Sequence, residues 1–244
     1  MRYLILSDLH ANWEALEAVL ADAQGEYDRI VCCGDVVGYG ADPNRVTEWV
    51  RQNVPVIVRG NHDRACVGLD DLQWFNPVAR RAAEWTQTEL TPDNFQFLRD
   101  LERGPRELSG IALVHGSPAD EDEYVITADD AAQLWPYLPA PLTFFGHTHL
   151  QGGFQFIRKQ VRDVLKATTA RETVAVDPEG WYLINPGSVG QPRDGDPSAA
   201  WALYDNAQRL LTFRRSRYDV AGAQRKIHEA GLPAALALRL ARGE

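Results

Sequence analysis

Short apolar runs recur along the first 150 residues of the chain, and a polar junction follows each of them. Between the runs lie segments whose apolar residues repeat with a helical period, as Trp13, Leu16 and Leu20 do. Alternation of β-rich runs with amphipathic helices is typical of βα units that build a largely parallel sheet. The pattern therefore predicts an α/β fold for this part of the chain.

Helix starts are marked by residues that cap helices. Asn12 precedes the first helical segment, and Thr127 with Asp130 three residues later resembles a capping box. Three further sites pair an N-cap residue type with proline at the first helical position, and these are Asp42-Pro43, Asn76-Pro77 and Thr91-Pro92. Each of these sites predicts the start of a helix.

After His149 the pattern changes to shorter strand-like pieces between turns rich in Gly, Pro and Asp. We expect antiparallel strands near 153–158, 171–176, 180–185, 199–205 and 208–215 that extend or face the first sheet. Residues 219–242 predict two short helices, interrupted at Gly231-Leu232-Pro233. The domain expected is 1–218, with 219–244 as a helical tail packed on it.

Composition and charge exclude several classes of partner. The chain has 244 residues, of which 45% are hydrophobic, and its net charge is −9. An acidic protein of this kind lacks the broad basic surface that duplex nucleic acid requires, so we expect no long nucleic acid partner. A small, charged substrate would then need cations at the site itself.

Targeting and cysteine patterns predict a cytoplasmic protein without membrane contact. The chain opens with a predicted strand rather than an export signal, and no run reaches about 18 apolar residues. The three cysteines, Cys32, Cys33 and Cys66, form neither a CxxC pair nor a disulfide framework. The sequence does not predict an oligomeric state.

Residues that can bind metal follow five of the apolar runs. The junctions are LILSDLH (Asp8, His10), VCCGD (Asp35), VIVRGNHD (Asn61, His62, Asp63), ALVHG (His115) and TFFGHTH (His147, His149). Groups at the carboxyl ends of strands in an open α/β sheet converge on one crevice. Any single histidine could be structural. Of the six histidines, however, all but His228 fall within these blocks, and it is their occurrence together that predicts a metal site.

This ligand set contains imidazole, carboxylate and amide groups but no thiolate, which suits Mn²⁺, Fe or Zn²⁺ in a catalytic site better than a structural zinc. Two cations about 3.5–4 Å apart repel each other unless an anion lies between them. Asp35 is the candidate for that bridge.

The five blocks follow the order D-x-H, G-D, G-N-H-D, H and G-H-x-H. In the content and order of these blocks the chain resembles the calcineurin-like metallophosphoesterases, over roughly residues 1–215. Within that family, its stretches GDVVGYGADPN, LVHGSP and NPGSVGQPRDGDP are similar to the small prokaryotic, phosphodiesterase-like branch. The resemblance implies a four-layer αββα sandwich, in which helices flank two mixed β-sheets.

The resemblance also implies roles for the junction residues. One metal would be held by Asp8, His10, Asp35 and His149, and the other by Asp35, Asn61, His115 and His147. His62, oriented by Asp63, would donate a proton to the leaving oxygen while a metal-bridging hydroxide attacks phosphorus. The two divalent ions are expected to be Mn²⁺, with Fe, Zn²⁺ and Ni²⁺ as alternatives.

The expected activity is hydrolysis of phosphodiesters, with phosphomonoesters or nucleotides as further substrates. Relatives with the same blocks leave two other enzymatic functions open, dinucleoside polyphosphate hydrolysis and protein Ser/Thr phosphatase action. The alternative outside enzymes is a binding scaffold on this fold without catalysis.

Five residues outside the ligand set have two interpretations each. Arg193, in the loop NPGSVGQPRDGDP, either binds the substrate phosphate or belongs to a simple turn. Asn12 either contacts the substrate or only caps its helix. Tyr39, Trp74 and Phe75 either stack on a nucleobase at the site or pack in the core.

Overall fold

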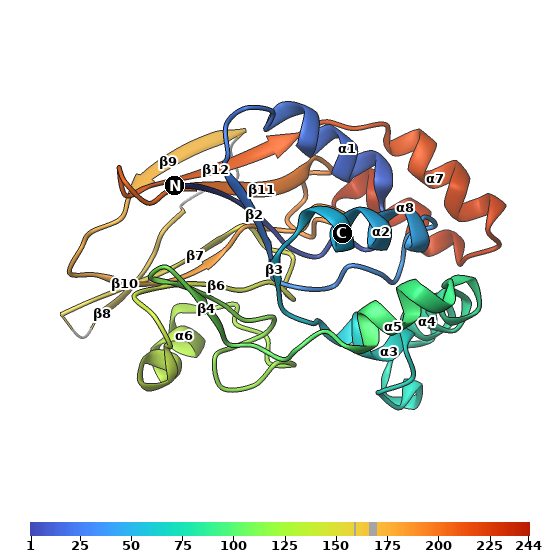
Figure 1. Ribbon diagram of the computed structural model, residues 1–244, viewed down its shortest axis with the longest axis horizontal. Coiled ribbons are helices and arrows are strands. Elements are labelled where there is room, and N and C mark those ends of the chain that lie inside the picture. The colour runs from blue at the N-terminus through green and yellow to red at the C-terminus, as the bar shows by residue number, and fades with distance from the viewer. Residues whose placement is uncertain (159, 166–169) are drawn as a thin grey trace.

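Two six-stranded sheets face each other in the computed structural model, which describes residues 1–158, 160–165 and 170–244 (Figure 1). The first sheet has the order β3-β2-β1-β11-β12-β9. Its strands are β3 (Val56–Ile57), β2 (Arg29–Cys32), β1 (Arg2–Leu6), β11 (Ala199–Asp205), β12 (Leu210–Ser216) and β9 (Arg171–Ala175).

The second sheet has the order β4-β5-β6-β10-β7-β8. Its strands are β4 (Arg106–Leu108), β5 (Ile111–Leu113), β6 (Leu142–Phe144), β10 (Trp181–Asn185), β7 (Gly152–Ile157) and β8 (Gln160–Asp163). The sequence analysis did not predict β8, because its residues QVRD are polar and largely exposed and give no apolar alternation.

Both sheets are mixed. The pairs β1–β2 and β2–β3 are parallel, as are β5–β6 and β6–β10, whereas the later strands β7, β8, β9, β11 and β12 are joined by antiparallel pairs. The predicted change from parallel to antiparallel strands is therefore confirmed with two exceptions, because β4 and β5 are antiparallel and β10 pairs in parallel with β6. The antiparallel strands extend each of the two sheets rather than forming a sheet of their own.

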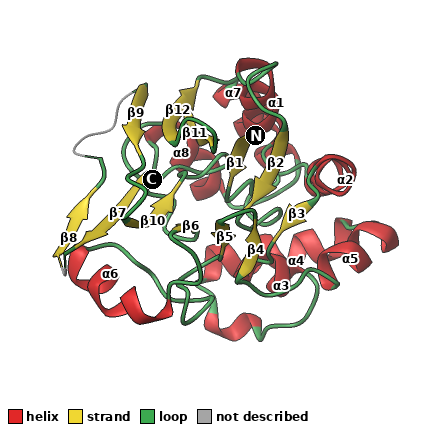
Figure 2. Cartoon of the chain, turned by 60° about the vertical axis from the view of Figure 1, so that its left-hand side comes forward, coloured by secondary structure: helices red, strands yellow, loops and turns green. Residues whose placement is uncertain are grey.

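Helices cover the outer faces of the sheets (Figures 1 and 2). On the first sheet, α1 (Trp13–Asp22) packs against β11 and β12, with α2 (Pro43–Asn53) beside it, and α7 (Val220–Glu229) packs on α1 and on α8 (Ala234–Arg242). Against the second sheet, α6 (Ala128–Leu134) packs on β7 and β8. The remaining helices are α3 (Asn61–Cys66), α4 (Pro77–Glu89) and α5 (Pro92–Arg99), with 3₁₀ turns at Leu72–Trp74 and Trp135–Tyr137. This confirms the predicted αββα sandwich. Among the described residues no helix is both long and apolar enough to cross a membrane.

The predicted helix starts are confirmed, and in four of the five the side chain makes the expected cap. Asn12, Asn76 and Thr91 accept backbone N–H bonds from the first turn of their helices, and Thr127 and Asp130 form a reciprocal capping box. Asp42 instead directs its carboxylate to Lys226 of α7, whose Nζ lies 2.6 Å away.

Two of the apolar clusters of the core meet at β1, which is buried on both faces. Tyr3 and Ile5 point between the sheets and pack with Phe144 and Ile184 of the second sheet. Leu4 and the other alternate side chains of β1 face the helices, where α1 packs. Such two-sided burial explains why the strand appears in the sequence as a continuous apolar run.

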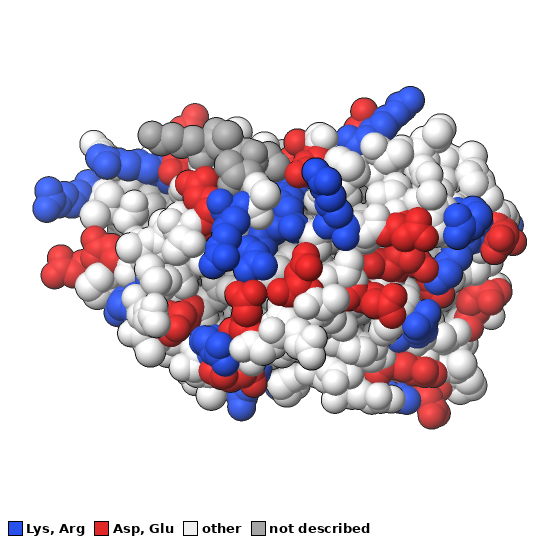
Figure 3. All heavy atoms as spheres, turned by 90° about the horizontal axis from the view of Figure 1, so that it is seen from above, with Lys and Arg blue, Asp and Glu red and all other residues white. Residues whose placement is uncertain are grey.

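The face drawn in Figure 3 carries acidic and basic side chains interspersed, in keeping with totals of 34 Asp and Glu against 25 Lys and Arg.

The terminal helices add a further apolar cluster. Ile227 of α7 and Leu236 of α8 pack there with Ala82 of α4 and with Tyr39.

Candidate metal centre

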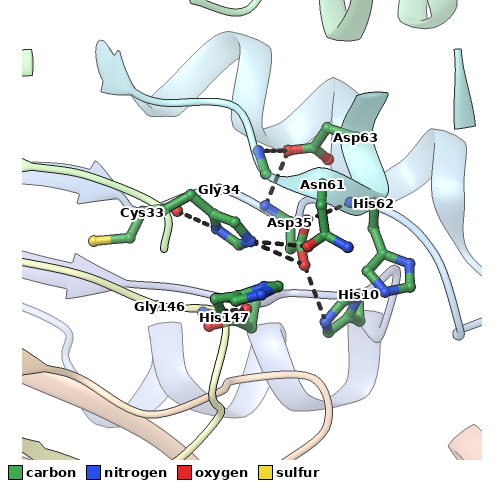
Figure 4. Close-up of polar contacts among 12 residues, drawn as sticks. His10, Cys33, Gly34, Asp35, Asn61, His62, Asp63, Gly146 and His147 are labelled. Atoms are coloured by element: carbon green, nitrogen blue, oxygen red, sulfur yellow. Dashed lines mark hydrogen bonds and ion pairs between the residues drawn. The ribbon is translucent and has the colours of Figure 1, made fainter. Parts of the chain in front are cut away.

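The five parallel strands β1, β2, β3, β5 and β6 end at one edge of the sandwich, and the predicted ligands follow their ends. Asp8, His10, Asp35 and His149 form one group, and Asp35, His115 and His147 form a second; within each group the ligand atoms lie within 4.8 Å of one another. The amide oxygen of Asn61 lies 3.2 Å from Nε2 of His115. The structure thus brings all seven predicted ligands together, and Asp35 belongs to both groups. Four of them, His10, Asp35, Asn61 and His147, are labelled in Figure 4.

The ligand-bearing loops adopt a conformation that most residues avoid. The φ angles of Asp8, His10, Asp35, His147 and His149 are 53°, 46°, 55°, 65° and 61°. A left-handed backbone is uncommon outside glycine and costs roughly 1–3 kcal/mol per residue. Bonds between the loops hold it in place, such as those from the N–H groups of Asp8 and His10 to the carbonyls of Gly34 and Asp35, at 2.9 and 3.0 Å. Strain of this kind is concentrated at functional sites.

Each predicted histidine ligand donates one ring N–H to a backbone carbonyl. Nδ1 of His10, His115 and His149 lies 3.1, 2.8 and 2.6 Å from the carbonyl oxygens of Val37, Cys33 and Gln191. In His147 it is Nε2 that lies 3.1 Å from the carbonyl of Asp122. Since a carbonyl can only accept, these bonds fix the tautomer of each neutral ring, whose other nitrogen is then an acceptor for a cation.

Two of these free nitrogens face each other. Nε2 of His10 lies 3.0 Å from Nε2 of His149, and both rings are buried. Two acceptor lone pairs at this distance repel each other unless a positive charge lies between or beside them. Burial also lowers the pKa of both rings well below the usual value, so protonation does not supply that charge near pH 7. The arrangement fits a bound cation.

The carboxylates of the site are almost fully buried. Burial raises the pKa of Asp8 to about 6, and Oδ2 of Asp8 has no hydrogen-bond partner among the described residues. Asp35 lies 3.4 Å from Nε2 of His115 and 3.7 Å from Nε2 of His10. A buried carboxylate oxygen without a partner is costly, which is a second reason to expect a cation here.

His115 carries a proton in the metal-free site. Burial alone would lower the pKa of His115, but the charge and hydrogen bond of Asp35, together with the charge of Asp8, raise it to about 10. A divalent ion between Asp35 and His115 would replace this proton.

His62 lies beside the ligands without joining either group. Its backbone N–H donates to Oδ1 of Asp35 at 2.8 Å, and its ring packs against those of His10 and Tyr39. Burial lowers the pKa of His62 to about 4, and Nδ1 of the ring is buried without a partner among the described residues. The ring borders a cleft of about 460 Å³ that also contains Asn61 and His147.

Asp63 contacts the backbone rather than the His62 ring. Its two carboxylate oxygens accept N–H bonds of 2.8–3.3 Å from Asp35, Val36, Val37 and Gly60. In Figure 4 the carboxylate and the His62 ring point away from each other. Burial and the charge of Asp35 raise the pKa of Asp63 to about 7, against the effect of the N–H donors. Asp63 therefore fixes the Asp35 loop.

Two glycines of the blocks are required by space. A Cβ on Gly60 would lie 2.0 Å from Oδ1 of Asp35, and one on Gly146 would lie 2.0 Å from Oγ of Ser7 and 2.7 Å from Oδ2 of Asp8. Any side chain at either position would displace a carboxylate of the site.

The two candidate substrate contacts differ in their surroundings. The Arg193 guanidinium lies beside the site, where Nη2 is 3.4 Å from the Tyr39 hydroxyl and 3.3 Å from Oε1 of Gln191. Its Nε is buried without a partner among the described residues. Asn12, by contrast, accepts from the N–H of Ala15 and donates to the carbonyl of Gly190, which supports the capping role that its sequence position also allowed.

The three aromatic candidates also differ in how exposed they are. Tyr39 is 6% exposed and packs in the cluster of the terminal helices, and Phe75 is half-buried beside it. Trp74 is 89% exposed.

The sequence analysis did not identify the carbonyl partners of the histidines, at Cys33, Val37, Asp122 and Gln191, because every residue has a carbonyl and only the fold selects one. It also overlooked Tyr124, whose ring lies 4.1 Å from that of His147. No motif marks this tyrosine.

Comparison with known proteins assigns the class. The family model for the calcineurin-like phosphoesterase superfamily domain matches residues 1–207. The chain therefore belongs to this superfamily, whose members are metal-dependent phosphoesterases.

Individual relatives agree with the assignment. The chain is 34% identical to the uncharacterized protein MJ0912 of Methanocaldococcus jannaschii, over 97% of this chain and 96% of that protein. A crystal structure of a metallophosphoesterase from Sphaerobacter thermophilus is 43% identical, with a TM-score of 0.86 over 100% of this chain and 99% of the other. The hypothetical protein PH1004 of Pyrococcus horikoshii OT3, 18% identical, shares the fold with a TM-score of 0.80 over 100% of this chain and 98% of that one.

Proposed function

We propose that the protein is a binuclear phosphoesterase that hydrolyses phosphodiesters, with phosphomonoesters and nucleotides as further substrates. The observation that carries the proposal is the pair of buried imidazole nitrogens, Nε2 of His10 and of His149, 3.0 Å apart at one end of a cluster in which Asp35 is shared by two candidate ligand groups. One ion would be held by Asp8, His10, Asp35 and His149, and the other by Asp35, Asn61, His115 and His147. Mn²⁺ is the proposed metal, with Fe, Zn²⁺ and Ni²⁺ as alternatives, because oxygen and nitrogen donors without thiolate suit metals of this group.

Bound divalent ions would supply Lewis-acid charge for the phosphoryl oxygens and lower the pKa of water that attacks phosphorus. The residues around the ions would bind the substrate and donate a proton to it. Arg193, which has no carboxylate partner among the described ion pairs, is placed to bind a phosphoryl oxygen. Removing it should raise KM or lower kcat without changing the metal content.

His62 is the proposed proton donor to the leaving oxygen. Its ring borders the cleft beside the ligand cluster and is not needed to complete either group. With a pKa of about 4 the ring is neutral near pH 7, but the negative charge of a phosphoryl group bound beside it would favour the protonated form. Asp63 is a positioning residue that holds the loop of Asp35.

A panel of substrates with each metal tests the proposal. Bis(p-nitrophenyl) phosphate, p-nitrophenyl phosphate, a cyclic nucleotide, diadenosine tetraphosphate and a phosphopeptide would be assayed with Mn²⁺, Fe²⁺, Zn²⁺ and Ni²⁺. The proposal predicts the highest kcat/KM for a diester with Mn²⁺. Greater activity on the tetraphosphate or the phosphopeptide would favour the alternatives, and no turnover with any metal would favour a scaffold.

A further inference from the structure

The cleft beside the proposed metal centre has an aromatic wall. It holds about 460 Å³ and is lined by Asn61, His62 and His147 at the metal centre and by Trp74, Phe75 and Tyr124 further out. This volume lies in the range of sites for small organic molecules, about 300–1,000 Å³. The cleft is therefore large enough for the organic part of an ester whose phosphate sits at the metal centre.

The exposed indole of Trp74 is unusual for the chain. Trp74 is 89% exposed, more than any other large hydrophobic side chain described as exposed, and Tyr124 is 50% exposed. Trp74 ends the short 3₁₀ turn Leu72–Trp74, which Asp71 caps by accepting from the N–H of Gln73. Its position is thus set by the backbone, while its ring remains free to contact a ligand.

The charges of the cleft disfavour a further anion. Its lining contains three carboxylates, Asp70, Asp71 and Asp122, and one guanidinium, Arg64. Arg64 is already bound to two of these carboxylates, with Nε 2.9 Å from Asp70 and Nη2 2.8 Å from Asp122. No cation of the described lining is left for a second phosphate, and the carboxylates can accept hydrogen bonds from amino groups.

We propose that this cleft binds the leaving group of the ester and selects a nucleoside without additional phosphates, whose base lies on the indole of Trp74. The inference rests on the proposed function, because His62 places the leaving oxygen at the inner end of the cleft. A base stacks on aromatic rings, and its amino groups suit an acidic wall. A polyphosphate chain would meet the carboxylates and is therefore a poor substrate.

The test compares two diesters that differ only in the alcohol beside the phosphate. These are the methyl esters of adenosine 5′-phosphate and of glycerol 1-phosphate, assayed with the Mn²⁺-loaded protein. The wild-type protein should show the lower KM for the adenosine ester. Trp74→Ala should raise that KM about tenfold, the loss of one stacking contact, and should leave the KM of the glycerol ester unchanged. Trp74→Phe, which keeps an aromatic ring, should restore most of the difference in KM between the two esters.

Tyr137→Ala is the matched control, because Tyr137 is 60% exposed on another 3₁₀ turn and does not line the cleft. It should leave both KM values unchanged. A direct readout is the quenching of tryptophan fluorescence by adenosine, which should occur in the wild type and be lost in Trp74→Phe.

Equal KM values for the two esters in the wild type, or an unchanged KM for the adenosine ester in Trp74→Ala, would overturn this inference while leaving the proposed function in place. A higher kcat/KM for diadenosine tetraphosphate than for the adenosine methyl ester would overturn the charge argument. Hydrolysis of neither methyl ester, with no quenching by adenosine, would overturn the inference, and the p-nitrophenyl substrates then show whether the proposed function fails with it.

Discussion

The candidate metal centre and the outer wall of the cleft beside it are held in opposite ways. At the metal centre, Asp8, Asp35 and His149 are no more than 1% exposed, have left-handed backbones and lie in loops that are hydrogen-bonded to one another. On the wall, Trp74 is 89% exposed and Tyr124 is 50% exposed. Cation binding requires donors fixed to within fractions of an ångström, so strain is tolerated there, whereas an apolar wall can accept ligands of several shapes. The difference predicts that variants at the metal centre lose most of the activity and that wall variants change only selectivity.

Asp35→Asn should have the largest effect, because Asp35 is the one residue shared by both ligand groups. The isosteric amide removes the negative charge that two adjacent cations require, so we expect kcat/KM to fall at least about 10³-fold and the metal content to fall with it. Mass spectrometry for metals on dialysed protein measures the content. Asp71→Asn, on the cleft wall, is the control and should keep its metal. Full metal occupancy in Asp35→Asn would contradict the predicted contrast between the metal centre and the wall.

His62→Ala should separate chemistry from metal binding at the metal centre. Loss of a proton donor lowers kcat by about 10²–10⁴-fold, and the metal content should not change because neither ligand group includes His62. A substrate with a good leaving group, such as p-nitrophenolate, should suffer less than an alkyl ester. An equal loss on both substrates would remove His62 from the role of proton donor.

Asp63→Asn should act through stability. Asp63 accepts four backbone N–H bonds, and the amide would turn its own N–H groups toward some of these donors. We expect the free energy of unfolding to fall by about 3 kcal/mol, with weaker metal binding. Denaturation by urea measures the change, and Asp28→Asn, whose carboxylate is on the surface, is the control. Equal stability of Asp63→Asn and the wild type would contradict the positioning role.

The pH dependence of metal binding should be the smallest effect. His115, with a pKa of about 10, is protonated at neutral pH in the metal-free protein, so a metal must displace that proton. Fewer protons compete as the pH rises, and the affinity should therefore increase about tenfold per pH unit between pH 6.5 and 8, with about one proton released. Calorimetry in buffers of different ionisation enthalpy counts the protons. Affinity that is independent of pH would show that His115 is neutral before the metal binds.

Part of this molecule could be predicted from its sequence. The candidate ligands could be identified because parallel strands such as β1 and β2 appear as apolar runs, and their carboxyl ends must meet at one edge. The helix starts followed from local capping chemistry, which acts within a few residues.

Other features of the site could not be predicted from the sequence, because they depend on tertiary contacts. Tyr39 and Trp74 are both aromatic residues that follow ligand blocks, yet one is 6% exposed and the other 89%. Only the position of the terminal helices, which cover Tyr39, separates them. Tyr124 lies in a loop without a motif. Gln191 lies in the NPGSVGQPRDGDP loop, but it contacts His149 through its backbone carbonyl, which no residue type marks.

The most direct test of the central claim is anomalous diffraction from a crystal soaked in Mn²⁺. We predict two peaks per chain, one beside His10 and His149 and the other beside His115 and His147, with Asp35 coordinating both. A single peak, or two peaks of which only one contacts Asp35, would contradict the binuclear centre.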